Sequence, residues 1–191
     1  MLKERYLRPA VVEDLREKMV FVGGPRQVGK TTLCRNLVAP HFKGRAYFNW
    51  DNRADRRAIA AANWPTDAEL LIFDEIHKHR TWKRWIKGEY DNLKETYKFL
   101  VTGSSRLDLY RRGGDSLQGR YHYYRLHPFS VAELEGISPG IAVGAELAFD
   151  GRPRGTALRT LMAYGGFPEP LTRQDARHLR RWQNEKLERS P

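Results

Sequence analysis

The stretch Val20-Phe-Val-Gly-Gly-Pro-Arg-Gln-Val-Gly-Lys-Thr31 carries the most specific pattern of the sequence. From Gly24 to Thr31 it fits G-x-x-x-x-G-K-[ST], after a short apolar run and before a segment that suits a helix, which is the context that this motif needs. Glycines let the backbone curl until successive N–H groups point at phosphate oxygens, and a helix that begins there adds a positive dipole end. The stretch therefore predicts a strand, a phosphate-binding loop and a helix.

Each part of this loop has an expected task. Lys30 is expected to reach the β and γ phosphates of a nucleotide, and the hydroxyl of Thr31 to bind Mg²⁺. The sequence has no Asn-Lys-x-Asp element for reading guanine, which favours ATP over GTP. The predicted nucleotide contacts of the loop are Gly24, Pro25, Arg26, Gln27, Val28, Gly29, Lys30, Thr31 and Thr32.

Two carboxylates, Asp74 and Glu75, end the apolar run of residues 70–73. Beside a phosphate loop, Asp74 is expected to bind Mg²⁺ or its waters. Glu75 is then expected to polarise the attacking water as a general base. The alternative is that both side chains merely cap the following segment.

Hydroxyl side chains follow the apolar run of residues 98–101. Either Thr102 or Ser104 can reach a γ phosphate as a sensor, and the spacing does not choose between them, although Ser and Thr are also common in turns. We count Ser104 among the predicted nucleotide contacts.

Arg120 directly precedes the last apolar run, residues 121–126. We expect it near the carboxyl edge of the sheet or at a subunit boundary, where a cation would stabilise charge on the γ phosphate in the transition state. Arg106, Arg111 and Arg112 compete for this role.

Five short apolar runs, with helix-like segments between several of them, are typical of a doubly wound α/β domain with buried parallel strands. Trp82, Trp85, Ile86 and Leu93 recur at helical spacing and predict a helix on the sheet. We expect residues 1–150 to form this core, and residues 151–191 to form a small helical lid or the start of a truncated C-terminal region. The last segment, residues 174–188, has little apolar surface, which suggests the front part of a longer protein.

Composition narrows the setting of the chain. One cysteine, Cys34, among 191 residues excludes an internal disulfide, and no signal peptide or membrane-spanning run is visible, so a cytoplasmic location without membrane binding is expected. The net charge of +11 arises in residues 1–50 and 151–191, whereas residues 51–150 are balanced. A DNA or protein partner and a bland basic surface both fit this distribution.

Together these motifs resemble the AAA+ ATPases of bacteria and archaea that usually carry a C-terminal domain of unknown function. The shared elements, in order, are Gly-Pro-Arg-Gln-Val-Gly-Lys-Thr-Thr-Leu, Phe-Asp-Glu-Ile-His-Lys, Thr-Gly-Ser-Ser-Arg, Leu-Gln-Gly-Arg, Leu-His-Pro-Phe-Ser and Gly-Gly-Phe-Pro-Glu-Pro. The resemblance implies a P-loop domain with a five-stranded parallel sheet, a helical lid after residue 150 and a tendency to form homo-oligomers.

The same resemblance suggests two site residues. Arg120 lies near the place where many AAA+ proteins carry an arginine finger. Gly-Gly-Phe-Pro is similar to the Gly-Leu-Pro element of signalling ATPases, whose proline lies against adenine, so Pro168 is an expected adenine contact. Members of the group usually continue with a winged-helix-like segment and a further domain, which do not fit after Pro191, so the output activity stays open.

Three functions compete at this point. The first is Mg²⁺-dependent hydrolysis of ATP to ADP and phosphate, coupled to movement of a lid or output domain. The second is a nucleotide-dependent switch or DNA- or partner-binding module with little turnover. A small-molecule kinase is the third, but the sequence offers no recognisable acceptor pocket.

Overall fold

A computed structural model describes residues 3–103, 117–137 and 155–188 of the chain. Its centre is a parallel sheet of five strands in the order β2-β3-β4-β1-β5. The strands are β1 (Met19–Gly23), β2 (Arg45–Asn49), β3 (Leu70–Asp74), β4 (Lys98–Thr102) and β5 (Tyr121–Arg125). The predicted α/β fold with a five-stranded parallel sheet is confirmed, and each strand lies within two residues of its apolar run.

Helices precede the sheet and connect its strands. They are α1 (Leu7–Asp14), α2 (Lys30–Thr32), the π-helix η1 (Leu33–Val38), the 3-10 helix η2 (Ala39–His41), α3 (Arg53–Ala61), the 3-10 helix η3 (Ile76–Lys78) and α4 (Trp82–Leu93). The helix predicted after the loop is therefore an α turn that continues as a π-helix, whereas α4 spans the four residues that predicted it.

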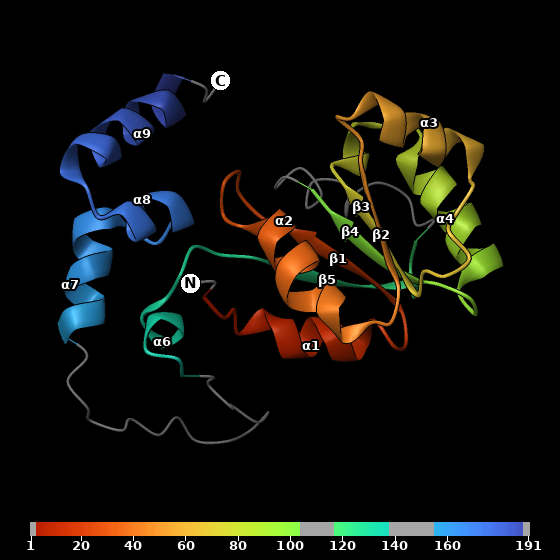
Figure 1. The fold of residues 1–191 in the computed structure, drawn as a ribbon, viewed down its shortest axis with the longest axis horizontal. Helices are drawn as coiled ribbons and strands as arrows, with labels where there is room; N and C mark the ends of the chain where they lie inside the picture. Colours follow the sequence, from red (N-terminus) through yellow and green to blue (C-terminus); the bar gives the residue numbers. More distant parts are fainter. Residues whose placement is uncertain (1–2, 104–116, 138–154, 189–191) are drawn as a thin grey trace. The chain divides into compact units, whose positions relative to one another are not determined.

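The sheet is covered on both faces. Figure 1 shows α3 and α4 on one side of it and α1 and α2 on the other. Since side chains alternate along a strand, one face receives Phe21, Phe73 and Phe99, which join an apolar cluster with Trp82 and Ile86 of α4. The other face carries the residues between them, and this is the face that builds the site described below.

Burial of the strands differs from the expectation of five buried ones. Every residue of β1 and β3 is buried, and so are four of the five in β4. The outer strands β2 and β5 are mostly half-buried. The prediction was wrong for these two because apolar and aromatic residues also suit an edge strand, and sequence does not give the strand order.

Two compact units divide the chain. The sheet unit is Leu7–Leu126, and the helical unit combines Met1–Tyr6 with His127–Pro191. The predicted boundary near residue 150 falls among residues 138–154, outside the described part of the chain, and stays a prediction. No helix within the described ranges is both long and apolar enough to cross a bilayer.

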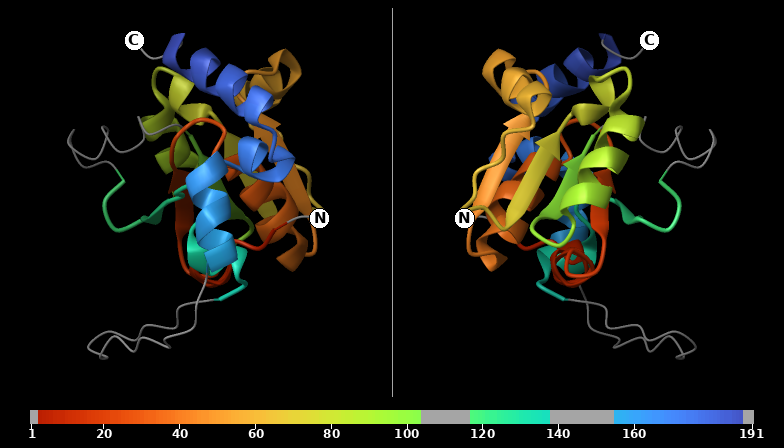
Figure 2. Two further views of the ribbon diagram at one scale, coloured as in Figure 1. Left: turned by 90° about the vertical axis from the view of Figure 1, so that its left-hand side faces the viewer. Right: turned by 90° about the vertical axis from the view of Figure 1, so that its right-hand side faces the viewer.

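The helical unit contains α6 (Val131–Leu134), α7 (Gly155–Tyr164), α8 (Pro168–Arg173) and α9 (Ala176–Glu188). Figure 2 shows α7, α8 and α9 following one another as separate helices. A buried ion pair of 2.9 Å between Arg5 Nε and Glu133 Oε1 ties the N-terminal segment to α6. Helix α8 was not predicted; it begins at Pro168, and proline is tolerated in the first turn of a helix.

Two glycines of the sheet unit offer a matched test of its packing. A Cβ added to Gly44 would lie 1.8 Å from the Asp67 carbonyl oxygen, whereas one added to Gly88 on α4 would meet no atom within 4 Å. We expect Gly44→Ala to lower the free energy of unfolding by about 1–3 kcal/mol or more through overpacking. Gly88→Ala is expected to raise it by about 0.5–1 kcal/mol, because alanine favours the helix.

Urea unfolding of both variants measures these changes as opposite shifts of the midpoint at an unchanged slope. Equal midpoints for Gly44→Ala and the wild type would mean that the turn before β3 yields freely, against the close backbone contact at Gly44.

Candidate nucleotide-binding site

The phosphate loop leaves the end of β1 in a conformation that its glycines permit. Gly24 has φ 152°, and a Cβ there would lie 2.5 Å from the carbonyl oxygen of Leu126. Gly29 has φ 97° and N-caps α2, while Gln27 also has a positive φ of 63°. The two motif glycines therefore stand where the backbone needs positive φ, which is what a curled phosphate loop requires.

Side chains of the loop differ in exposure. Val28 is fully buried and anchors the loop in the core, so it can offer only its backbone to a ligand. Arg26, Gln27, Thr31 and Thr32 are exposed, and Pro25 is half-buried. The loop thus exposes mostly polar side chains to solvent, while Val28 packs in the core and fixes the loop in place.

Lys30 folds back across the loop. Its Nζ donates hydrogen bonds to the carbonyl oxygens of Gly24 at 3.0 Å and Pro25 at 2.8 Å. Burial lowers the pKa of this ammonium, and the nearby carboxylates of Glu75 and Asp74 oppose that shift. A buried cation with its carboxylates at a distance is suited to receive an anion such as phosphate.

Asp74, at the end of β3, collects three hydroxyl groups although it is only 4% exposed. Its Oδ2 accepts hydrogen bonds from Thr31 Oγ1 at 2.7 Å and Tyr47 Oη at 2.8 Å. Its Oδ1 accepts a short hydrogen bond from Thr102 Oγ1. The predicted pair of Thr31 and Asp74 is therefore in direct contact, beside the loop.

The sequence did not decide whether Thr102 or Ser104 is the residue that senses the γ phosphate. Thr102 is fully buried and bonds to Asp74, so it lies in the site. Ser104 falls among residues 104–116, outside the described part of the chain, as do Arg106, Arg111 and Arg112.

Glu75 follows Asp74 in a left-handed conformation, φ 58° and ψ 19°. Its backbone N–H donates to the Thr102 carbonyl oxygen at 3.1 Å, which ties it to the end of β4. Its Oε2 lies 3.2 Å from Lys78 Nζ and 3.8 Å from His77 Nε2. Lys78 also contacts Asp51 at 2.5 Å, and although burial alone would lower its pKa, hydrogen bonds to Asp51 and Glu75 raise it.

Arg120 lies at the edge of the sheet opposite to the phosphate loop. The parallel register pairs Met19 with Tyr121 at the start of both strands, and Met19 N donates to the Arg120 carbonyl. The loop leaves the other end of β1, about 13 Å away at the usual rise of a strand. The expectation that Arg120 emerges near the carboxyl edge was wrong, and its alternative, a subunit boundary, stays a prediction.

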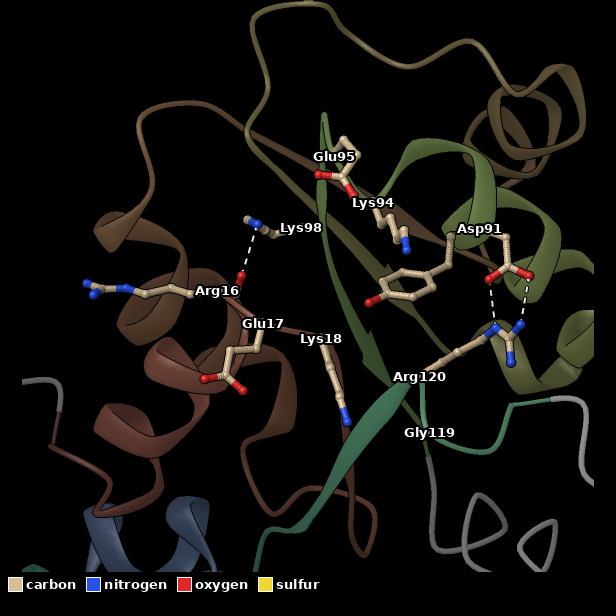
Figure 3. A pocket seen from close by; sticks show the side chains of 10 residues that line it. Arg16, Glu17, Lys18, Asp91, Lys94, Glu95, Lys98, Gly119 and Arg120 are labelled. Carbon is tan, nitrogen blue, oxygen red and sulfur yellow. Dashed lines mark hydrogen bonds and ion pairs between the residues drawn. The ribbon is translucent and has the colours of Figure 1, made fainter.

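A pocket of about 390 Å³ surrounds Arg120 at this amino edge (Figure 3). The Arg120 guanidinium forms a fork with Asp91, with Nε–Oδ1 2.7 Å and Nη2–Oδ2 3.1 Å. These hydrogen bonds lower the pKa of Asp91. Arg16, Lys18, Lys94 and Lys98 also line the pocket.

Pro168 is the first residue of α8 and belongs to the helical unit. Its predicted contact with adenine therefore stays a prediction.

Sequence reasoning missed Tyr47 as a site residue. It sits at the third position of β2, in register with Ile72. Because side chains alternate, Tyr47 and Asp74 share one face of the sheet, but the pairing of β2 with β3 cannot be read from the chain alone.

The donor set fits a nucleotide with Mg²⁺. Mg²⁺ prefers oxygen ligands and keeps most of its waters, and the site supplies the Thr31 hydroxyl and the Asp74 carboxylate together. The buried ammonium of Lys30 and the loop backbone, curled at Gly24 and Gly29, fit phosphate oxygens. Thr31, Asp74 and Lys30 are thus the residues that would hold the metal and the phosphates.

Solved structures with the same fold include RuvB, the Holliday junction branch migration motor of Thermotoga maritima, with TM-score 0.52 and 20% identity. A single-residue variant of that motor gives TM-score 0.54 and 18% identity, and both matches cover 92% of this chain and 59% of theirs. The Aeropyrum pernix ORC1 protein in complex with DNA matches over 72% of this chain and 48% of its own, with TM-score 0.46 and 16% identity. The chain thus spans about three-fifths of the RuvB structures, and the likeness shows a shared fold.

Among curated proteins, none matches this sequence. The sequence pattern of the family described as "AAA domain" matches residues 16–135, which is more than half of the chain and includes the loop, Asp74, Glu75 and Arg120. This chain belongs to the AAA domain family.

Proposed function

We propose that this chain binds ATP with Mg²⁺ and hydrolyses it to ADP and phosphate. The observation that carries the proposal is the 2.7 Å hydrogen bond between Thr31 and Asp74, which joins the phosphate loop to the acidic end of β3. In P-loop NTPases the Ser or Thr of the loop and an Asp at a strand end hold Mg²⁺ together, and this contact brings the same two kinds of group to one place.

The residues divide the chemistry between them. Lys30 uses two of its three donors on loop carbonyls, which leaves one for a phosphate oxygen, and its charge offsets that of the phosphates. Mg²⁺ bound by Thr31 and Asp74 would neutralise charge on the β and γ phosphates. Glu75, the next residue after Asp74, takes a proton from the attacking water as general base. Thr102 and the predicted Ser104 orient these groups at the end of β4.

A second function is favoured by one contact. The carboxylate of Glu75 is ion-paired with Lys78 at 3.2 Å. If the pair keeps Glu75 from accepting a proton from water, the protein would bind nucleotide without hydrolysing it. The chain would then be a nucleotide-dependent switch, whose basic segments 1–50 and 151–191 hold DNA or a protein partner.

Titration calorimetry with ATP and ADP, in Mg²⁺ and in EDTA, together with phosphate release, tests both functions. We expect tighter binding with Mg²⁺ than in EDTA, because the ion offsets phosphate charge, and phosphate release that stops in EDTA. Binding without release would favour the switch, and no binding in either condition would contradict both functions.

The proposal extends to Arg120 and the helical unit. Arg120 lies away from the loop of its own chain, so it acts on the nucleotide of a neighbouring subunit in a homo-oligomer. The helical unit, with Pro168 against adenine, acts as the lid that hydrolysis moves.

A trans-acting Arg120 makes activity depend on protein concentration. We expect specific ATPase activity of the wild type to rise with concentration, and Arg120→Ala to lose about 10³-fold or more at the highest concentration, as for other arginine fingers. Arg16→Ala is the matched control, because Arg16 lines the same pocket and ion-pairs with Glu13 at 3.5 Å, not with Asp91. Equal activity of Arg120→Ala and wild type across concentrations would refute the role.

A further inference from the structure

Tyr47 reaches the centre of the site from the edge strand β2. Its hydroxyl donates to Asp74 Oδ2 at 2.8 Å, the same oxygen that accepts from Thr31 at 2.7 Å. Strand register explains the reach: Asn49 pairs with Asp74, so Tyr47 lies one same-face position further back, and its long side chain spans the diagonal.

The ring of Tyr47 is held from its other side. The Arg35 guanidinium carbon lies 4.4 Å from the ring centroid, and Arg35 belongs to η1, which continues the helix of the phosphate loop. The phenolic O–H of Tyr47 is a hydrogen-bond donor at ordinary pH, and it points at the Asp74 carboxylate. Tyr47 therefore donates a lasting hydrogen bond from a fixed ring.

Counting donors shows what this hydrogen bond does. A carboxylate offers about four lone-pair sites, and Asp74 uses three of them for hydroxyls. If Thr31 gave its hydroxyl to a metal ion, the Tyr47 bond to Oδ2 and the Thr102 bond to Oδ1 would remain to hold the carboxylate. Tyr47 and Thr102 would then set the orientation of the carboxylate, as hydrogen-bond partners of metal-binding groups do.

We infer that Tyr47 is a positioning residue for Asp74, whose hydroxyl fixes the carboxylate toward Mg²⁺ in the nucleotide complex. This role rests on the proposed function, because it needs Asp74 to act on the metal or its waters. Tyr47 lies on β2, which carries neither the phosphate-loop motif nor the acidic strand end.

Tyr47→Phe removes the hydroxyl and keeps the ring on Arg35. Tyr124→Phe is the matched control. Tyr124 lies on β5, at the opposite edge of the sheet, and its Oη donates a hydrogen bond to Asp14 Oδ2 at 2.6 Å. The affinity for ADP is measured by titration calorimetry in Mg²⁺ and in EDTA, for both variants and the wild type.

We expect Tyr47→Phe to reduce the gain in ADP affinity that Mg²⁺ brings by about 10-fold or more, as for other partners of metal-binding groups. Its affinity in EDTA should stay within about twofold of the wild type, since the hydroxyl is not placed on the phosphates. Tyr124→Phe should resemble the wild type in both conditions.

The outcomes separate this role from the proposed function. If the wild type binds ADP with the same affinity in Mg²⁺ and in EDTA, both the proposed function and the role of Tyr47 are contradicted. If Mg²⁺ helps the wild type and Tyr47→Phe equally, the role of Tyr47 is overturned while the proposed function stands. Equal losses in Mg²⁺ and EDTA would also overturn it, because the hydroxyl would then support the loop and not the metal.

Discussion

Lys30→Met is expected to weaken Mg²⁺–ATP binding by about 30-fold to several thousand-fold and to abolish phosphate release. Loss of one partner from a buried charge pair costs about 2–5 kcal/mol, which corresponds to this range. Titration calorimetry and phosphate release measure both effects. Methionine keeps the apolar part of the side chain and lacks only the terminal ammonium, so the loss reports the ammonium itself.

The same change should leave the fold intact. Burial lowers the pKa of Lys30 below its ordinary value, so the unfolded chain holds this proton more tightly than the folded one. The buried charge therefore costs stability at all pH values below the folded pKa, and the cost fades as pH rises from that pKa to about 10.4, the unfolded value. Lys30→Met removes the cost and two hydrogen bonds together, and we expect unfolding free energy to change by no more than about 1 kcal/mol.

Lys18→Met is the matched control for charge. Lys18 lines the pocket at the amino edge of the sheet, away from the loop. Its substitution should leave ATP affinity unchanged. Equal losses in the two variants would show that net charge, and not the position of Lys30, governs binding.

The fold could be predicted from sequence because its signals are local. A strand that ends in glycine, a loop with fixed glycines and an apolar run that ends in Asp74 each depend on neighbouring residues alone. The α4 helix likewise follows from one periodic face, with Trp82, Ile86 and Tyr90 buried. Thr31 and Asp74 were expected to lie together because the loop follows β1 and Asp74 ends β3. In a parallel sheet, both positions lie at the carboxyl edge.

Non-local features could not be predicted. Tyr47 contacts Asp74 only because β2 pairs with β3 in one register, and a shift of one residue would point its ring to the other face. The positive φ of Glu75 also has no sequence signal, since glutamate rarely adopts it.

The position of Arg120 was within reach of sequence reasoning. A residue just before a strand that runs parallel to β1 must lie at the amino edge, whereas the phosphate loop follows β1 at the carboxyl edge. The residue that precedes β5 was expected near the carboxyl edge or at a subunit boundary, and the parallel pairing of Met19 with Tyr121 excludes the first of these. If Arg120 acts on a nucleotide, that nucleotide must therefore lie in the phosphate loop of a second subunit.

Glu75→Gln is expected to lower the rate of phosphate release by about 10²–10⁴-fold, the usual share of a general base. Glutamine keeps the size of the side chain, and its carbonyl oxygen can still accept from Lys78, which lies 3.2 Å from Glu75 Oε2. ATP affinity should therefore stay within about threefold of the wild type. Single-turnover release and calorimetry separate the two effects.

Asp51→Asn tests whether such a loss comes from Glu75 or from its neighbour. Asp51 Oδ2 contacts the same Lys78 ammonium at 2.5 Å, so its substitution disturbs Lys78 without touching the carboxylate of Glu75. Near wild-type release in Asp51→Asn, beside a large loss in Glu75→Gln, would assign the base to Glu75. Comparable losses in both would mean that the position of Lys78 limits turnover, and an unchanged rate in Glu75→Gln would favour a switch that holds ATP without using this carboxylate.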